Sequence, residues 1–291
     1  MKYIKWVNKN IKSLENKTIV ITGATGSIGI YTTKYLAYLK ANVIIAVRNA
    51  KKGNLLIEEI KKDFPDCNIS MMLVDFSSIE SVDNFSNELA KINMDYYITT
   101  AGVYHLPETV TKDGLEIHYE TNYYNQIRVI ERLNKDLPVT VVSSISHKKC
   151  RIDFDNIMSL GVKNRTKVYG RSKRLLNYHL VNLKNKGYDI RITHPGISAT
   201  SLFASEKGGF GKLFNLFIVP IMKLIFHSPD KASLPVLLGL NEEVEVCKEI
   251  GPKGLFNAWG YPKVVKLSKK LLDEQKQTKI IEYYNSLKKW N

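Results

Sequence analysis

Residues 18–29 read TIVITGATGSIG, an apolar run rich in β-branched residues that stops at three glycines spaced three apart. A helical pattern begins at about Ser27, so the stretch predicts a strand, a tight turn and a helix, the first half of a βαβ unit. Glycines let backbone N–H groups approach an anion, and the start of the helix adds partial positive charge there. A dinucleotide pyrophosphate suits this turn, although a strand–helix turn without a ligand shows the same pattern.

Outward from this turn, predicted strands and helices alternate along the chain. We expect strands at 42–47, 68–74, 95–99, 139–143 and 188–193, with a last edge strand at 254–258. We expect helices at 27–39, 51–62, 79–92, 115–133, 166–186 and 229–240. Repeated strand–helix units before residue 140 predict an α/β fold of Rossmann type, with a doubly wound, mainly parallel sheet and helices on both faces. In such sheets ligands bind at the carboxyl ends of the strands.

The absence of a linker or a low-complexity segment predicts a single domain over residues 1–291. We assign 18–200 to a cofactor-binding and catalytic core, 204–240 to a substrate lid region, and 263–289 to a helical tail. Residues 1–16 carry apolar residues at helical spacing, which predicts a short amphipathic helix packed on the domain. Lying on a membrane surface is the alternative use of that helix.

The chain is basic, with 43 Lys and Arg against 28 Asp and Glu and a net charge of +15. The basic residues are scattered in short pairs between acidic ones, and no basic block reaches five residues. We therefore expect no nucleic-acid partner, and attribute the charge to a solvated basic surface and a phosphate-bearing cofactor.

The cysteines and histidines give no sign of a metal centre. Cys67, Cys150 and Cys247 lie far apart without a C-x-x-C pair, which predicts neither a disulfide framework nor a zinc site. The six histidines also lack metal-ligand spacing, so we expect no metal. A signal peptide and an apolar stretch of 18 residues are both missing from the sequence, which predicts a cytoplasmic location and no spanning helix.

Tyr169 and Lys173 stand four residues apart in a predicted helix, and therefore on one face one turn apart. An ammonium group beside a phenol favours the phenolate and lowers the tyrosine pKa, which suits proton transfer in alcohol–carbonyl interconversion. A surface Tyr and a surface Lys would show the same spacing. Ser143 and Ser144 end a predicted strand, where a hydroxyl group can bond a substrate oxygen, and Asn122 lies inside a predicted helix that disfavours asparagine.

In their order along the chain, these motifs resemble those of the short-chain dehydrogenase/reductase family, in its retinol-dehydrogenase-like branch. The matching segments are 22–29, 47–49, 73–78, 101–103, 111–116, Asn122, 142–144, 169–173, and His194-Pro195-Gly196 with Thr200. The family fold is a Rossmann sheet of about seven strands, and its members use NAD or NADP. The resemblance therefore implies a seven-stranded sheet and an oxidoreductase.

The resemblance also implies a catalytic set of four residues. Tyr169 is the acid/base, and Lys173 lowers its pKa and holds the nicotinamide ribose. Ser144 orients the substrate oxygen, and Asn122 supports a water in a proton relay near Lys173. The implied cofactor contacts are Gly23, Thr25, Gly26, Ser27, Ile28, Gly29, Arg48, Asn49, Asp75, Phe76, Ala101, Gly102, Tyr169, Lys173 and Thr200.

Within that set, Asp75 bonds the adenine, Ala101 and Gly102 let the backbone approach the ribose, and Thr200 contacts the carboxamide or the phosphates. The sequence departs from the branch at three places. The middle glycine of the turn, Gly26, stands one place earlier than usual. Thr99-Thr100 replaces the usual Asn-Asn, which weakens the expected bracing of that strand, and Asn125 replaces a glycine.

The residues after the second predicted strand favour NADP over NAD. An acidic side chain at this position would bond the 2′-hydroxyl of NAD, whereas an arginine accommodates the 2′-phosphate of NADP. This chain has Arg48 and Asn49, followed by Lys51-Lys52. We expect NADPH as the cofactor, with NAD the less favoured choice.

The apolar segment 213–226 suggests a hydrophobic substrate. It follows three glycines, is interrupted by Pro220, and is too short to span a bilayer. We expect it to cover the pocket with one face, while its other face contacts a second subunit or a membrane surface; packing into the core is the alternative. The predicted partner is thus a hydrophobic alcohol or carbonyl compound, with a homo-oligomer or peripheral membrane contact. The alternative function is a non-catalytic NADP(H)-binding sensor or scaffold.

Overall fold

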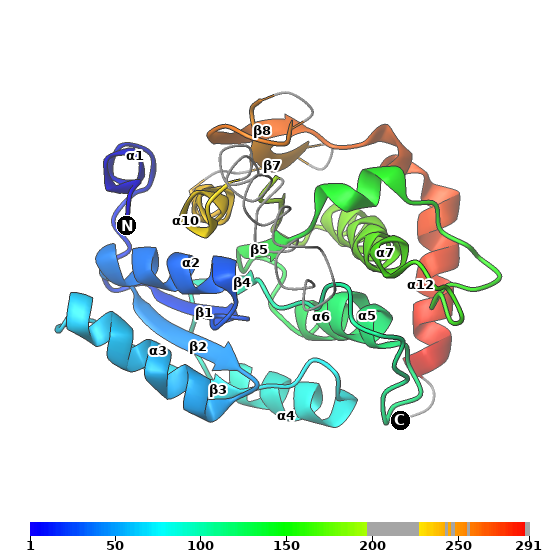
Figure 1. Ribbon diagram of the computed structural model, residues 1–291, viewed down its shortest axis with the longest axis horizontal. Coiled ribbons are helices and arrows are strands. Elements are labelled where there is room, and N and C mark those ends of the chain that lie inside the picture. Colours follow the sequence, from blue (N-terminus) through cyan, green and yellow to red (C-terminus); the bar gives the residue numbers. More distant parts are fainter. Residues whose placement is uncertain (197–226, 242–243, 246–247, 255–256, 289–291) are drawn as a thin grey trace, which may run out of the picture.

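The strand that precedes the glycine turn, β1 (Thr18–Thr22), lies inside the sheet (Figure 1). It pairs in parallel with β2 (Asn42–Val47) on one side and with β4 (Tyr96–Thr99) on the other. Its last four residues are buried, as expected for a β-branched strand covered on both faces. This computed structural model describes residues 1–196, 227–241, 244–245, 248–254 and 257–288.

The described residues form one eight-stranded sheet in the order β3-β2-β1-β4-β5-β6-β7-β8. All neighbouring pairs are parallel except β7 and β8. The remaining strands are β3 (Ile69–Leu73), β5 (Val139–Val142), β6 (Ile190–Thr193), β7 (Lys248–Pro252) and β8 (Pro262–Lys266). The chain runs outward from β1 to β3 and then returns to β4, so the strand order reverses between β1 and β4, where ligands bind in such sheets.

The predicted Rossmann-type class is confirmed, but the sheet has one strand more than the seven expected. The edge strand expected at 254–258 is wrong, because β7 and β8 lie on either side of that range. The antiparallel strand β8 has two adjacent β-branched residues, Val264 and Val265, which suit a strand at the edge of the sheet. The backbone N–H of Gly254 instead donates to the Trp259 carbonyl at 2.8 Å, in the connection between the two strands.

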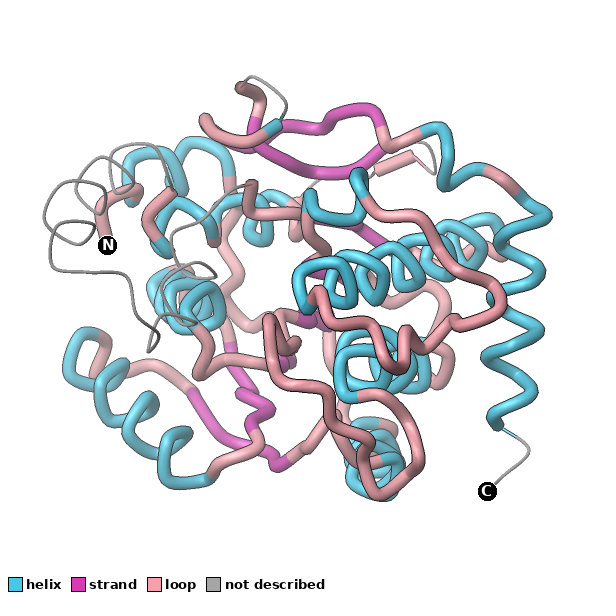
Figure 2. The backbone as a smooth tube through the Cα atoms, turned by 45° about the vertical axis from the view of Figure 1, so that its right-hand side comes forward, coloured by secondary structure: helices cyan, strands magenta, loops and turns pink. Residues whose placement is uncertain are grey.

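Helices cover both faces of the sheet (Figure 2). One face carries α1 (Ile4–Asn10), α2 (Ser27–Tyr38), α3 (Ala50–Asp63), α10 (Pro229–Ala232) and α11 (Leu234–Leu238). The other carries α4 (Ile79–Leu89), α5 (Ile117–Tyr119), α6 (Asn125–Ile130), α7 (Arg165–Asn185) and α12 (Glu274–Lys288). Short 3₁₀ turns form η2 (Ile145–Lys149) and η4 (Lys269–Leu272). The N-terminal segment packs on the domain, with Val7, Ile11 and Leu14 buried.

Two predicted helices are interrupted. The helix expected at 115–133 is α5 and α6 joined by a π-helical turn, η1 (Glu120–Tyr124). The side-chain amide of Gln126, on α6, donates to the Thr121 carbonyl of that turn at 3.1 Å. A side chain thus supplies a hydrogen bond to a carbonyl of the widened turn. The helix expected at 229–240 divides into α10 and α11 next to Pro235, whose ring nitrogen has no hydrogen to donate.

Some predictions fall outside the described residues: Thr200, Cys247, and the lid segment 213–226. Among the helices that the structure describes, none has the length and apolar character needed to cross a membrane.

Glu131, just after α6, fastens the C-terminal helix to the domain. The hydroxyl of Tyr284 on α12 donates to Glu131 Oε2 at 3.1 Å, and Lys288 on the same helix forms an ion pair with this carboxylate. His179 Nε2 on α7 lies 3.5 Å from Glu131 Oε1. Burial by itself raises the pKa of Glu131, but the hydrogen bonds from His179 and Lys288 outweigh it and hold that pKa at about 2.

We predict that Glu131→Gln lowers the free energy of unfolding at pH 7 by about 1–2 kcal/mol, since an amide cannot form this ion pair. The pKa of Glu131 in the folded protein lies below its ordinary value of 4.5. Its contribution is therefore complete above pH 4.5 and is lost as the pH falls towards 2. The difference between wild type and variant, measured by urea unfolding, should close over that range. Glu282→Gln, exposed on α12, is the control and should show no difference.

Candidate active site

The glycine turn brings the end of β1 against the end of β4. Gly23 has a positive φ of 70°, and a Cβ atom there would lie 2.5 Å from the backbone nitrogen of Ala101. A Cβ atom on Gly29 would lie 2.2 Å from the carbonyl oxygen of Gly23. Only glycine fits either position, so these two residues let α2 begin directly over the strand end. Gly26 stands at the N-cap of α2, where the helix exposes unpaired N–H groups.

A cleft of about 310 Å³ opens at this point, where the strand order reverses. Its lining includes most of the predicted cofactor contacts: Gly23, Thr25, Gly26, Arg48, Asn49, Asp75, Phe76, Ala101 and Gly102. Five other predicted contacts are not part of the lining, namely Ser27, Ile28, Gly29, Tyr169 and Lys173, and Gly29 acts through packing. The lining also contains Lys52, one of the two lysines that follow Arg48 and Asn49, and it contains Val103 and Thr121, which are not among the predicted contacts. The N–H groups at the start of α2 and the basic side chains beside it fit the phosphates of a dinucleotide.

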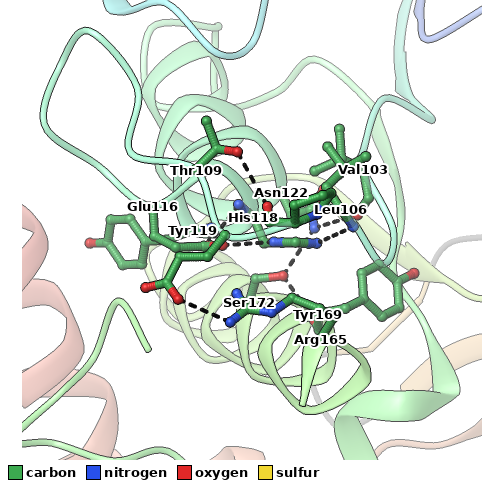
Figure 3. A network of polar contacts seen from close by, with 12 residues as sticks. Val103, Leu106, Thr109, Glu116, His118, Tyr119, Asn122, Arg165, Tyr169 and Ser172 are labelled. Atoms are coloured by element: carbon green, nitrogen blue, oxygen red, sulfur yellow. Dashed lines mark hydrogen bonds and ion pairs between the residues drawn. The ribbon is translucent and has the colours of Figure 1, made fainter. Parts of the chain in front are cut away.

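Asn122 holds the floor of this cleft in place (Figure 3). Its side-chain oxygen accepts a hydrogen bond from Val103 N at 2.7 Å, and its amide nitrogen donates to Val103 O at 2.9 Å. The same nitrogen donates to Ser172 Oγ at 3.0 Å. The π-helical turn thus places a fully buried asparagine between the segment after β4 and helix α7. A Cβ atom on Gly102 would lie 2.9 Å from Asn122 Oδ1, so a side chain at this position would clash with Asn122.

His118 holds the segment after β4 in place through a hydrogen bond with Leu106, which Figure 3 shows. Its Nε2 accepts a hydrogen bond from Leu106 N at 3.3 Å, and its Nδ1 lies 2.8 Å from Glu116 Oε1. These two bonds place the proton on Nδ1, because Nε2 is the acceptor. His118 thus has a structural role in positioning this segment.

Tyr169 and Ser144 meet near the end of β5. Ser144 is the N-cap residue of η2, and its hydroxyl lies 3.2 Å from both the nitrogen and the hydroxyl of Ser146. The Tyr169 ring lies edge-to-face against Tyr104, with ring centroids 4.8 Å apart. Burial raises the pKa of Tyr169 to about 12, partly offset by a side-chain hydrogen bond with Ser144. The neighbouring Ser143 is buried, so Ser144 is the serine positioned for chemistry.

Lys173 lies one helical turn after Tyr169 and is 4% exposed. Its Nζ donates to the Val142 carbonyl at 2.9 Å, and it lies 3.5 Å from the position that a Cβ atom on Gly102 would take. Burial lowers the pKa of Lys173 to about 8. The expectation that Lys173 lowers the pKa of Tyr169 is not met in this structure. Burial acts on both groups in the direction of their neutral forms, and the ammonium group bonds a carbonyl.

Two of the three departures from the family pattern, Thr99-Thr100 and Asn125, make hydrogen bonds that brace the structure. Thr99 Oγ1 donates to Gln126 Oε1 at 2.5 Å, and Gln126 Nε2 donates to the Ala101 carbonyl at 3.3 Å. Thr100 Oγ1 donates to the Thr22 carbonyl at 2.8 Å, so β4 is braced despite the missing asparagines. Asn125 donates to the Phe76 carbonyl at 2.9 Å and ties α6 to the end of β3. The sequence offered no signal for the role of Gln126, because it depends on a side chain 27 residues away.

Asn122 and Lys173 therefore lie next to Gly102 in the wall of a cleft that can take a dinucleotide, with Ser144 and Tyr169 nearby, although none of the four lines the cleft itself. Hydrogen bonds join Ser144 to Tyr169 and Asn122 to Ser172, and Lys173 lies beside the cleft backbone at Gly102. Together, a phenol, a hydroxyl and an ammonium group can bind a carbonyl or alcohol oxygen and exchange a proton with it.

Comparison with known proteins agrees with this arrangement. The family model for short chain dehydrogenase matches residues 17–136. Retinol dehydrogenase 13 of Mus musculus is 27% identical over 248 residues, which cover 80% of this chain and 74% of that protein. Short-chain dehydrogenase TIC 32 B of Brassica napus is 31% identical over 218 residues, 67% of this chain and 68% of that protein.

Solved structures support the fold. An uncharacterized protein from Mycobacterium Paratuberculosis superimposes with a TM-score of 0.75 at 23% identity, covering 97% of this chain and 96% of that chain. An actinorhodin polyketide ketoreductase solved with NADPH gives a TM-score of 0.58 at 15% identity, covering 79% of this chain and 92% of that chain.

We predict that the buried ammonium group of Lys173 destabilises the protein at pH 7 in the absence of nucleotide. Lys173→Met should then be more stable than wild type by about 1–3 kcal/mol at that pH. The pKa of about 8 in the folded protein lies below the ordinary 10.5, so the unfolded chain binds more protons between these values. Wild-type stability therefore rises relative to the variant from pH 8 to 10.5. Urea unfolding across this range measures the difference, with the exposed Lys167→Met on the same helix as the control. A difference that does not change with pH would contradict the prediction.

Proposed function

This chain belongs to the short-chain dehydrogenase/reductase family, in the branch of the retinol dehydrogenases, and we propose on that basis that it is an NADP-dependent oxidoreductase interconverting an alcohol and a carbonyl group. The observation that carries the proposal is the meeting of Ser144, Tyr169 and Lys173 beside the dinucleotide cleft. Its decisive test is the activity of a Tyr169 variant, described below.

The proposed mechanism gives each residue a separate task. When bound, the nicotinamide supplies or takes up the hydride. Tyr169 transfers its phenolic proton to the substrate oxygen during reduction and takes it back during oxidation. The Ser144 hydroxyl holds that oxygen by a hydrogen bond. Lys173, whose pKa is about 8, stays mainly protonated at neutral pH and can return a proton towards Tyr169.

Asn122 acts as a positioning residue in this mechanism. Its three hydrogen bonds fix the segment after β4 and Ser172 relative to each other. Since Ser172 directly precedes Lys173 on α7, Asn122 controls the distance between the cleft floor and the ammonium group. A water relay past Asn122 is the role that the family resemblance implies for it.

The cofactor preference rests on the end of β2. Arg48, Asn49 and Lys52 line the cleft there, and Asn49 caps α3 by accepting a hydrogen bond from Lys52 N at 3.0 Å. Two cationic side chains favour the 2′-phosphate of NADP, whereas NAD needs an acidic partner for its 2′-hydroxyl. Asp75, on the far side of the cleft, accepts from the backbone nitrogen and the hydroxyl of Ser77, which fixes its carboxylate beside the adenine position.

The proposed substrate is hydrophobic. This part of the proposal rests on the apolar composition of 213–226, which lies outside the described residues. The same segment is the basis for proposing contact with a second subunit or a membrane surface. Two of the similar proteins are named for retinol and polyprenol, which are both apolar alcohols.

A non-catalytic NADP(H) sensor is the competing function. Such a protein needs the cleft but has no use for Ser144, Tyr169 and Lys173 together. The two functions differ in one measurement, NADPH oxidation with a panel of aldehydes and ketones of graded chain length. Turnover of any of them above the rate without protein decides for the enzyme.

We predict that Tyr169→Phe lowers kcat by about 10²–10⁴-fold, because only the proton donor is removed. The Kd for NADPH, measured by fluorescence titration, should change less than about threefold, since the ring remains in place. That titration is the internal control for a folded cleft. Wild-type kcat in the variant would falsify the proposed role of Tyr169.

We predict that wild type binds NADPH more tightly than NADH, and that Arg48→Asp reduces this preference by at least about tenfold. Lys51→Asp makes the same change of charge at the next exposed basic position on α3, which does not line the cleft, and should alter the preference little. Equal affinity of the wild type for the two nucleotides would count against the NADP assignment.

A further inference from the structure

A second hollow, of about 540 Å³, lies between the loop after η2, helix α7, η4 and helix α12. Figure 1 shows α7 and α12 side by side, with that loop beside them. The hollow shares no lining residue with the dinucleotide cleft. Six of its ten lining residues are basic: Lys148, Lys149, Arg151, Arg174, Lys270 and Lys276.

Two of these six charges are neutralised by the protein. Lys148 Nζ lies 2.9 Å from Glu249 Oε1, and Lys276 forms an ion pair with Asp273. In the part of the chain that the structure describes, no carboxylate lies within ion-pair distance of the other four. The hollow therefore keeps four positive charges around one concavity.

One of these four positive charges, that of Arg174, is buried and therefore differs from the charge of an exposed lysine. Its side chain comes from α7 and is only 5% exposed. Its guanidinium group donates to the His147 carbonyl at 3.0 Å, to the Cys150 carbonyl at 2.7 Å and to the Tyr178 hydroxyl at 3.3 Å. All three acceptors are neutral, so the bonds orient the group without cancelling its charge. A buried cation without an anion is costly, and an anion from outside the chain would remove that cost.

Neighbouring groups respond to the positive charge of Arg174. The pKa of Cys150 is raised by burial, and the charges of Arg171 and Arg174 oppose that rise. Burial lowers the pKa of His147 to about 3, and the charges of Lys148 and Arg174 lower it further. The positive field of Arg174 thus reaches η2 and the start of the loop that borders the hollow.

We propose that this hollow is a binding site for a small molecule that carries a diphosphate or a similar cluster of phosphate charges. A single carboxylate would leave most of the four charges uncompensated, whereas a diphosphate matches them. Arginine and lysine are the side chains suited to phosphate oxygens, and a concave basic surface concentrates such ligands. The volume lies in the range of small-molecule sites, and Phe154 and Tyr178 add aromatic walls for the rest of the ligand.

The test is calorimetric titration of the full chain with inorganic pyrophosphate at low ionic strength, without magnesium. The test variant is Arg151→Glu/Lys270→Glu, which reverses two exposed charges of the hollow. The control is Lys61→Glu/Lys62→Glu, an equal change of charge in the last turn of α3. We expect the affinity for pyrophosphate at this site to fall at least about tenfold in the test variant and less than about twofold in the control.

Pyrophosphate also fits the dinucleotide cleft, so the titrations are repeated with saturating NADPH. We expect binding in the hollow to persist under that condition. Equal affinities in the test and control variants, or binding that disappears entirely with NADPH, would overturn the proposal. If NADPH itself does not bind, the proposed function fails. The pyrophosphate affinities of the test and control double variants still show whether the hollow binds pyrophosphate.

A neutral variant guards against loss of folding. Arg151→Gln/Lys270→Gln removes the charges without adding acids, and its thermal unfolding should match that of the wild type. We expect a loss of affinity intermediate between wild type and the charge-reversed variant. A chain that binds hexaglutamate but not pyrophosphate would instead have a docking site for an acidic protein, which would also overturn the proposal.

Discussion

The close approach of two backbones, at Gly23 and Ala101, is the constraint on which the rest of this structure depends. A Cβ atom on Gly23 would stand 2.5 Å from the Ala101 nitrogen, so the ends of β1 and β4 meet only because that atom is missing. This contact lies at the point where the strand order reverses, between β1 and β4. The start of α2 and the cleft lie at this same point, where ligands of such sheets bind.

Buried polar contacts then hold the floor of the cleft. Asn122 spans from the segment after β4 to α7, and Gln126 joins Thr99 to the Ala101 carbonyl. Both amides come from the π-helical turn or the helix that follows it. A regular α-helix would turn these side chains by a different angle, so the wider turn and the polar contacts support each other. Nearly all of this network is shielded from water, where satisfied hydrogen bonds give a defined geometry and unsatisfied ones are expensive.

Burial also sets the proton chemistry of the site. It raises the pKa of Tyr169 to about 12 and lowers that of Lys173 to about 8, which favours the neutral form of each group. The two pKa values, 10.0 and 10.5 in water, thus move apart, so passing a proton from the phenol to the amine costs more than in water, whereas passing one from the ammonium group to a phenolate is favoured. The same effect explains why the ammonium group bonds the Val142 carbonyl. In the basic hollow beside α12, the buried Arg174 likewise bonds neutral oxygens, three of them.

By itself, the sequence determined the fold class, the glycine turn, the strands β1 to β6 to within about two residues, and the membership of the family. These features depend on the spacing of residues that are close together in the sequence, and a local pattern is therefore enough to predict them. The tertiary structure decided the rest. The break of one helix at η1, the strands β7 and β8, the bracing of Thr99 by Gln126 and the pKa values of Tyr169 and Lys173 all depend on residues far apart in the chain. Their energies come from burial and from contacts across the sheet, which no local pattern records.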